Sequence, residues 1–123
     1  MKVLLSIRPE FANKIFEGTK LYEFRKKIFK NPNVTKVVVY ASYPVQKVIG
    51  EFEIDYILND DPALLWKQTE KFSGISESYF FQYFAEKKEG FAIKVKNTRR
   101  YSQPLCLRKE FNKIPPQSFL YLV

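Results

Sequence analysis

The spacing of apolar positions changes along this chain, and the changes predict the order of its elements. Residues 2–8 are apolar enough for a strand, while residues 9–17 place apolar side chains at helical spacing behind a proline suited to a first helical turn. Gly18 follows, and glycine is the residue that most often ends a helix. The first two elements are therefore expected to be a strand and a helix.

Residues 20–28 alternate between apolar and charged positions, which predicts a strand with one packed face. Tyr22, Phe24 and Ile28 share the packed face. The opposite face carries Glu23, Arg25 and Lys27. Strict alternation puts Lys20 on the Tyr22 face, so its long side chain is expected to curl around the helix-to-strand junction to reach the charged face.

Two further strands follow a turn at residues 31–33. Residues 36–42 are apolar on both faces, as in a strand buried on each side. Residues 47–57 alternate, and Gly50 marks a bulge or a sharp bend. The connections are too short for helical crossovers, so these strands are expected to pair antiparallel.

The middle of the chain predicts two helices. Asp61 is suited to cap the first, with Pro62 at the first helical position, and residues 73–74 end it. Ser76 is suited to cap the second. The aromatic side chains of residues 79–84 recur at helical spacing, which favours core packing over a platform for stacking bases.

The last third of the chain returns to strands. Residues 90–97 alternate, with Lys94 and Lys96 facing outward. A short piece at residues 105–107 and a basic connector then lead to a last strand at residues 114–122. The whole pattern predicts one α+β domain over residues 1–123, built on a closed or nearly closed barrel of roughly five to seven mostly antiparallel strands.

Composition limits the class of protein. No apolar run approaches the roughly 20 residues that cross a bilayer, and the single Cys106 has no partner for an intramolecular disulfide. We therefore expect a cytoplasmic protein without a membrane partner. The chain has no histidine, so neither a zinc site nor a histidine-based triad is expected, and no metal or cofactor is predicted.

The net charge of +8 is unevenly distributed. Residues 1–50 carry a net +7, residues 51–90 a net −5 and residues 91–123 a net +6. If the first and last strands are neighbours, the basic segments merge into one surface suited to phosphates. The alternative is ordinary solubilising charge.

Several short segments, in this order, resemble a known family. The chain resembles an ASCH domain of the PUA-like superfamily. The resemblance rests on Ser6-Ile7-Arg8-Pro9, Ile15-Phe16-Glu17-Gly18-Thr19-Lys20, Tyr22-Glu23-Phe24-Arg25, Tyr40-Ala41-Ser42 with Pro44, Gly50-Glu51-Phe52 and Pro116-Gln117-Ser118-Phe119. It implies a small β-barrel with a helix at one end, RNA binding in the cleft between them, and a role in transcription or translation.

The resemblance also implies site residues. The charged cluster after the first helix is expected to line the cleft, where arginine suits a phosphate or a guanine edge and glutamate accepts from an exocyclic amine. The alternative is a plain surface ion pair between Glu23 and Arg25, worth about 0–1 kcal/mol. The residues expected to contact single-stranded nucleic acid are Arg8, Lys20, Glu23, Arg25, Lys27, Ser42, Lys94, Lys96, Arg99 and Arg100.

Two other functions stay open at this point. Some ASCH relatives hydrolyse acylated nucleosides with a lysine, a threonine and a glutamate. Lys20 matches the lysine, but Glu23 replaces the threonine, and only Glu70 and Glu77 lie near the expected acid. A small hydrolase, either a ribonuclease or an amidohydrolase acting on a modified nucleoside, would use Lys20 and Glu23 as acid and base.

A protein-interaction module is the other alternative. Tyr43, Tyr101 and Tyr121 are candidates for exposed aromatic side chains at such an interface. Strong salt dependence of binding separates a phosphate partner from an aromatic protein interface. The sequence leaves the oligomeric state open, and it does not distinguish RNA from DNA or from a nucleoside ligand.

Overall fold

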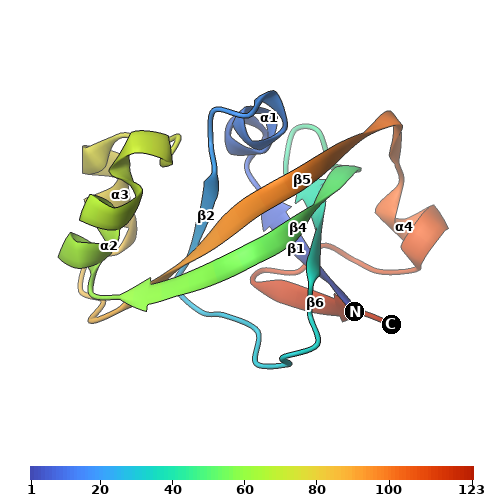
Figure 1. The fold of residues 1–123 in the computed structure, drawn as a ribbon. Helices are drawn as coiled ribbons and strands as arrows, with labels where there is room; N and C mark the ends of the chain where they lie inside the picture. The colour runs from blue at the N-terminus through green and yellow to red at the C-terminus, as the bar shows by residue number, and fades with distance from the viewer.

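Six strands form one strongly curved sheet in the computed structural model, which describes residues 1–123 (Figure 1). The sheet order is β2-β5-β4-β3-β1-β6. The elements are β1 (Lys2–Ile7), α1 (Pro9–Glu17), β2 (Tyr22–Arg25), β3 (Lys36–Ala41), β4 (Lys47–Asp60), α2 (Pro62–Thr69), a short 3-10 helix η1 (Glu70–Phe72), α3 (Glu77–Tyr83), β5 (Gly90–Leu105), α4 (Leu107–Phe111) and β6 (Phe119–Leu122). The predicted α+β class is confirmed.

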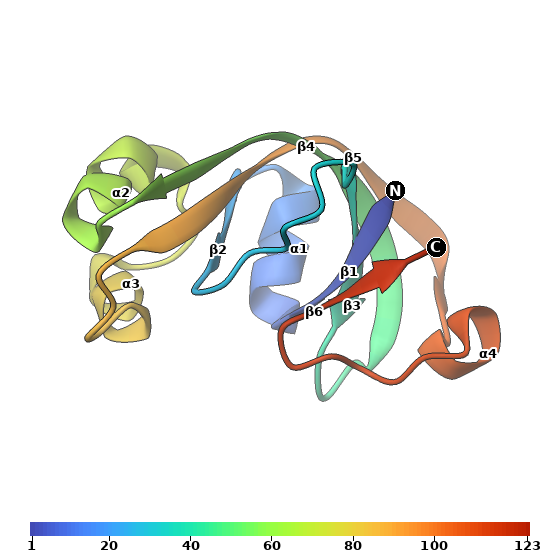
Figure 2. The same cartoon turned by 90° about the horizontal axis from the view of Figure 1, so that it is seen from below.

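The first and last strands, β1 and β6, are neighbours in the sheet. This is the condition under which the basic segments at the two chain ends are expected to merge. Lys2 of β1 lies opposite Leu122 of β6 in an antiparallel pair, and both views show the two chain ends close together (Figures 1 and 2). The pair β1–β3 is parallel, whereas the other four pairs are antiparallel. The sheet is therefore mixed.

Of the predicted closed or nearly closed barrel, only the closed form is excluded, because the edge strands β2 and β6 do not pair. The sheet curls around α1 but stays open (Figure 2). Residues 26–35 cover the open side, where the backbone N–H groups of Lys30 and Asn31 donate to the Tyr121 hydroxyl at 3.1 and 3.2 Å. Side chains and a loop therefore bridge the two edges where a closed barrel has a strand ladder.

Both faces of the sheet are covered. The main core lies against α1, which buries Ala12 and Ile15. A second cluster joins α2 and α3 to β2 and β5, and a third joins Leu107 of α4 to β1, β3 and β4. Five of the six β3 residues are buried, which confirms the prediction of a strand buried on both faces. No helix is long and apolar enough to span a membrane.

Local signals in the sequence placed several element ends correctly. Gly18 adopts a left-handed conformation after α1, and the side chains of Asp61 and Ser76 accept backbone N–H groups at the starts of α2 and α3. The register of β4 shifts beside Gly50, which confirms the predicted bulge. A Cβ atom on Gly50 would lie 2.6 Å from the Arg99 carbonyl oxygen, so glycine allows this close approach.

Other boundaries differ from the prediction. The strand expected over residues 20–28 is only β2, because the chain leaves the sheet after Arg25. The strand expected over 90–97 continues to Leu105, since β5 pairs with β4 along its whole length. The expected connector contains α4. The last strand starts only at Phe119, after two prolines that cannot donate to a ladder.

Candidate functional site

A cavity of about 230 Å³ opens between the start of α1, the strand β2 and the helix α3. Aromatic rings form much of its wall, and charged side chains lie among them, as is common in ligand sites. We call it the Lys20 cavity. It is lined by Ser6, Ile7, Arg8, Phe11, Lys20, Glu23, Phe24, Arg25, Ile75, Tyr79, Tyr83 and Gln117.

Lys20 is the most unusual residue of this cavity. Its side chain is almost fully buried, with 1% of its surface exposed. Its Nζ atom donates to the Ser73 carbonyl oxygen at 2.6 Å and takes part in none of the ion pairs within 4.0 Å. The rings of Phe24 and Phe11 lie 4.8 and 5.3 Å from Nζ. Lys20 is thus a buried ammonium without a carboxylate partner.

The expectation that Lys20 curls around to the Glu23 face is wrong. Its ammonium stays beside the Phe24 ring, on the side that strict alternation predicts. Glu23 lines the same cavity from the opposite face of β2. Both faces reach the cavity because β2 is an edge strand, with no neighbour on its free side.

The turn before α3 is built around the Lys20 side chain. Gly74 has a φ of 70°, which favours glycine, and a Cβ atom there would lie 2.4 Å from the Lys20 Cβ atom. The Leu21 N–H donates to the Phe72 carbonyl oxygen at 2.9 Å, which ties the two segments together. The backbone of this turn therefore encloses the lysine stem and directs its ammonium into the cavity.

Burial changes the acidity of this lysine. Loss of water around the ammonium lowers the pKa of Lys20 from 10.5 to about 8; the negative charge of Glu23 opposes that change, and Lys14 adds to it. An amine with a pKa near 8 exchanges a proton readily at neutral pH. Lys20 can therefore act as an acid in its charged form or as a nucleophile in its neutral form.

Arg25 holds Glu23 in place and connects separate parts of the sheet. Its Nη1 atom lies 3.2 Å from Glu23 Oε2 and also donates to the Ser6 carbonyl oxygen at 3.2 Å. Its Nη2 atom donates to the Ser118 carbonyl oxygen at 2.6 Å. The guanidinium thus links β2 to β1 and to the segment before β6, across the open side of the sheet.

This arrangement corrects the role predicted for Arg25. The sequence suggested a solvated arginine fork for a phosphate or a guanine edge, but only 12% of the Arg25 side chain is exposed. Three acceptors already occupy its Nη groups. Glu23, at 8% exposure, accepts from Arg25 through Oε2 alone, so Oε1 is the carboxylate oxygen left for a ligand.

Arg8 and aromatic rings form the mouth of the cavity. Arg8 donates to the Tyr79 hydroxyl at 3.1 Å, and its guanidinium lies 5.5 Å from the centre of the Phe11 ring. The Tyr79 and Tyr83 rings are nearly parallel, with centres 6.5 Å apart. A shallow groove of about 280 Å³ continues from the mouth past Lys14. Glu10 also lines the groove and pairs with Arg8 at 2.9 Å, so the open end of the site is aromatic and carries two basic side chains and one acidic side chain.

Comparison with known proteins identifies the family. The family model described as the ASCH domain matches residues 5–104. This chain belongs to the ASCH domain family. The ASCH domain-containing ribonuclease of Zymomonas mobilis is 31% identical over 126 residues, and the match covers 98% of this chain and 84% of that protein.

Solved structures agree with this assignment. The crystal structure of ASCH from Zymomonas mobilis superposes on this chain with a TM-score of 0.90 at 28% identity, and the match covers 99% of this chain and 87% of that chain.

Some relatives are much longer than this chain. The ATP synthase subunit alpha of Ureaplasma parvum is 32% identical over 121 residues, which are 98% of this chain but only 15% of that protein. This ASCH domain thus spans a small part of some relatives.

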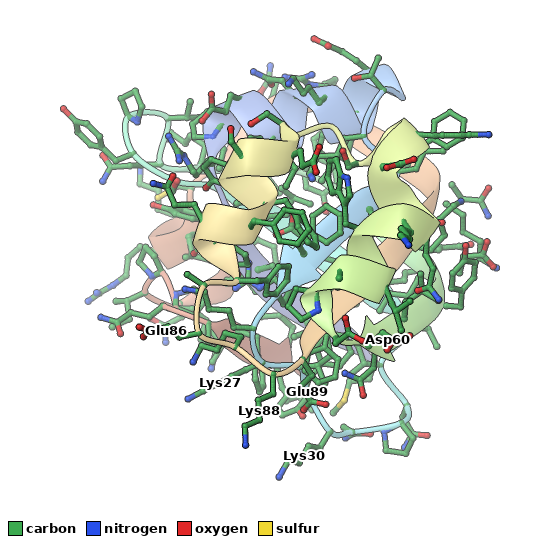
Figure 3. All side chains as sticks on the ribbon, turned by 90° about the vertical axis from the view of Figure 1, so that its left-hand side faces the viewer. Lys27, Lys30, Asp60, Glu86, Lys88 and Glu89 are labelled. Carbon is green, nitrogen blue, oxygen red and sulfur yellow. The ribbon has the colours of Figure 1, made fainter.

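Three predicted site residues lie outside the Lys20 cavity for separate reasons. Lys27 follows β2 and points into solvent at the lower edge of the molecule (Figure 3). Ser42 follows β3, and its N–H donates to the Ile7 carbonyl oxygen at 3.0 Å without its side chain reaching the cavity. Lys94 is partly buried, with Nζ 3.9 Å from Asp55 Oδ2. None of the three lines the cavity of this ASCH domain.

The remaining basic residues form a separate surface. Lys96, Arg99 and Arg100 are exposed on β5, beyond the part of the strand that packs in the core. Arg100 donates to Asn13 Oδ1 at 2.8 Å. These residues do not line the cavity, so the predicted basic surface and the cavity are two distinct features.

Sequence reasoning missed Tyr79 and Tyr83 as site residues, because their helical spacing predicts core packing. Phe80 of α3 and Phe84 directly after it are buried, while the two tyrosines, four residues apart, line the cavity. The hydroxyl groups were the available signal, because a buried tyrosine needs a polar partner. For Ser73 and Gly74 the sequence predicts only the end of a helix.

The structure also shows where the residues expected for an amidohydrolase and for a protein-interaction module lie. Glu70 and Glu77 do not line the cavity, so the acid of the amidohydrolase arrangement is missing there. Tyr101 donates to Glu51 Oε1 at 2.8 Å, and the Tyr121 hydroxyl accepts from the backbone, which leaves Tyr43 as the strongly exposed one. No three His, Cys, Asp or Glu side chains are grouped closely enough to hold a metal ion.

Proposed function

We propose that this ASCH domain binds single-stranded RNA and holds one nucleotide of the strand in the Lys20 cavity. The observation that carries the proposal is the Lys20 ammonium, which is buried without a carboxylate partner and faces an aromatic-walled cavity. A buried charge is costly unless a partner compensates for it, and an oxygen-rich ligand supplies that partner. The relationship to a protein named a ribonuclease supports RNA as the ligand.

The mouth of the cavity suits the rest of the strand. Single-stranded RNA is commonly bound by stacking of its bases on aromatic side chains and by basic residues along its backbone. Tyr79 and Phe11 offer ring faces or edges at the mouth, while Arg8 and Lys14 border the groove that continues from it. In this arrangement the ribose and phosphate of one nucleotide enter the Lys20 cavity, the neighbouring bases stack at its mouth, and further phosphates lie along the groove.

Removing the two basic groups of the groove is the first test. The double variant Arg8→Ala, Lys14→Ala is expected to weaken binding of a labelled single-stranded RNA and to reduce the slope of log K against log salt by about 1.4, which corresponds to two phosphate contacts. The matched variant Lys96→Ala, Arg99→Ala removes the same charge from β5 and is expected to weaken binding less. Equal losses in filter retention would place the strand outside the cavity.

Cleavage of the bound RNA is a second candidate function, favoured because Lys20 and Glu23 share one cavity. The Glu23 carboxylate would take the proton of a 2′-hydroxyl, whose oxygen attacks the adjacent phosphorus. The Lys20 ammonium would give a proton to the departing 5′-oxygen. The products are a 2′,3′-cyclic phosphate and a 5′-hydroxyl, and the two residues exchange protons with water before the next turnover.

The pH dependence tests this assignment. Because the acid must be the charged form of Lys20, whose pKa is about 8 in the free protein, the cleavage rate at RNA concentrations far below saturation is expected to fall as pH rises through 8. The measurement is the rate of cleavage of labelled RNA between pH 6 and 10 with EDTA present. A rate that keeps rising above pH 8, or that survives Lys20→Met, would rule out Lys20 as the acid.

A further inference from the structure

RNA binding and cleavage use Lys20 in its charged form, yet the site also favours the neutral amine. The Ser73 carbonyl oxygen at 2.6 Å and the Phe24 and Phe11 rings, whose centres lie 4.8 and 5.3 Å away, favour the charged form of the side chain. The side chain is buried and no ion pair holds its charge, so the loss of water outweighs these contacts. Such surroundings make a lysine amine nucleophilic, as in enzymes that form imines with carbonyl compounds. The lowered pKa of Lys20 agrees with this environment.

We propose that Lys20 forms an imine with the C1′ aldehyde of an abasic 2′-deoxyribose in a single strand, and that Glu23 then promotes cleavage of the strand by β-elimination. The proposal rests on the proposed function in one respect, because the same cavity and groove must hold the strand.

The shape of the cavity favours an abasic sugar over a free aldehyde. Lys20 lines the cavity among the aromatic rings of the wall, with 1% of its surface exposed. A nucleotide without its base leaves room for the sugar to approach the amine. Arg8, Lys14 and Glu10 line the groove with a net positive charge, which favours an aldehyde that is carried on a phosphate chain.

The reaction balances without any other reagent than water. The neutral Lys20 amine adds to the C1′ aldehyde, and loss of one water with uptake of one proton from the solvent gives a protonated imine. The Glu23 carboxylate removes one C2′ proton, and the electron pair forms an enamine that expels the 3′-phosphate as the C3′–O bond breaks. Water then hydrolyses the conjugated protonated imine, which leaves an unsaturated aldehyde on the upstream fragment, and Lys20 and Glu23 each release one proton to the solvent to return to the neutral amine and the carboxylate.

Reductive trapping tests the covalent step. The probe is a short single-stranded RNA with one photocaged 2′-deoxyribose abasic site, uncaged by light in the presence of sodium cyanoborohydride. The wild type is expected to form a covalent adduct that denaturing gels resolve and mass spectrometry assigns to Lys20, with a yield that rises up to about pH 8. Lys20→Met is expected to lose the adduct. Lys88→Met, a change at an exposed lysine after α3 (Figure 3), is expected to keep it.

The rate of strand scission without reductant tests the role of Glu23 as the base. Glu23→Gln retains an acceptor for Arg25 and is expected to form the imine adduct while strand scission without reductant slows by about 100-fold, the usual contribution of a general base. Scission at the wild-type rate would overturn the role of Glu23. Circular dichroism of each variant confirms that it is folded.

The outcomes distinguish this inference from the proposed function. Retention of the caged strand is measured in parallel, and it reports noncovalent binding alone. Retention without a wild-type adduct, or with an equal adduct in Lys20→Met, overturns the imine proposal and leaves RNA binding standing. Absence of retention for the caged and the uncaged strand overturns both. The opposite pH trends of trapping and RNA cleavage separate the two reactions of the same lysine.

Discussion

Replacing Lys20 with methionine is expected to abolish RNA binding at the cavity and, at the same time, to make the protein more stable. Lowering a lysine pKa from 10.5 to about 8 corresponds to a cost of about 3 kcal/mol for keeping the charged form folded at neutral pH. Methionine fills a similar volume without a charge. Loss of the hydrogen bond to Ser73 offsets part of the gain, so the free energy of unfolding is expected to rise by about 1–2 kcal/mol.

The gain in stability has a defined pH window. A lysine with a folded pKa of about 8 and an unfolded pKa of 10.5 releases protons on folding between these values, so the stability of the wild type rises with pH across this interval. Urea denaturation of both proteins at several pH values measures the difference. The advantage of Lys20→Met should be largest below pH 8 and disappear above about pH 10.5. A methionine variant less stable at pH 7 would show that Lys20 serves the fold.

Arg25→Ala is expected to have the opposite effect and to destabilise the fold by about 2–4 kcal/mol. The change leaves Glu23 buried without its partner and removes donors from the Ser6 and Ser118 carbonyl oxygens. It also removes the side-chain link across the open side of the sheet. Thermal and urea denaturation measure the loss.

The control for Arg25→Ala is a change at an arginine that does not link the strands across the open side of the sheet. Arg100→Ala removes an exposed guanidinium whose hydrogen bond goes to Asn13, and its denaturation midpoint is expected to match the wild type. If Arg25→Ala were as stable as Arg100→Ala but failed to bind RNA, Arg25 would be a ligand-binding residue and the structural role described above would be wrong.

Elements with strong local signals could be predicted from the sequence, and those fixed by distant contacts could not. The helix α1 has a proline at its start and a glycine after its end, and β3 is apolar at nearly every position. The outer half of β5 is polar on both faces, and its pairing with β4 extends it to Leu105. Likewise α4 is short, and packing of Leu107 in the cluster with β1, β3 and β4 stabilises it.

The candidate site follows the same rule. The resemblance and the spacing brought Lys20, Glu23 and Arg25 to one place, and all three line the cavity. Their environments were not predictable, because the acceptors of Arg25 come from Ser6 and Ser118, which lie 19 and 93 residues away in the chain. The alternation of side chains along a strand predicts that these charged groups lie at the surface. Segments that are distant in the sequence pack over them and bury them.

The pKa of Lys20, measured with and without RNA, shows whether the strand occupies the Lys20 cavity. Lysine labelled with ¹³C at Cε reports protonation of Nζ in NMR titrations, and Lys20→Met identifies the signal. The free protein is expected to show a pKa of about 8. Saturation with a single-stranded RNA should raise it by about one unit or more, since an anionic ligand beside the ammonium favours the charged form. An unchanged pKa in a protein saturated with RNA would contradict the claim that the strand occupies this cavity.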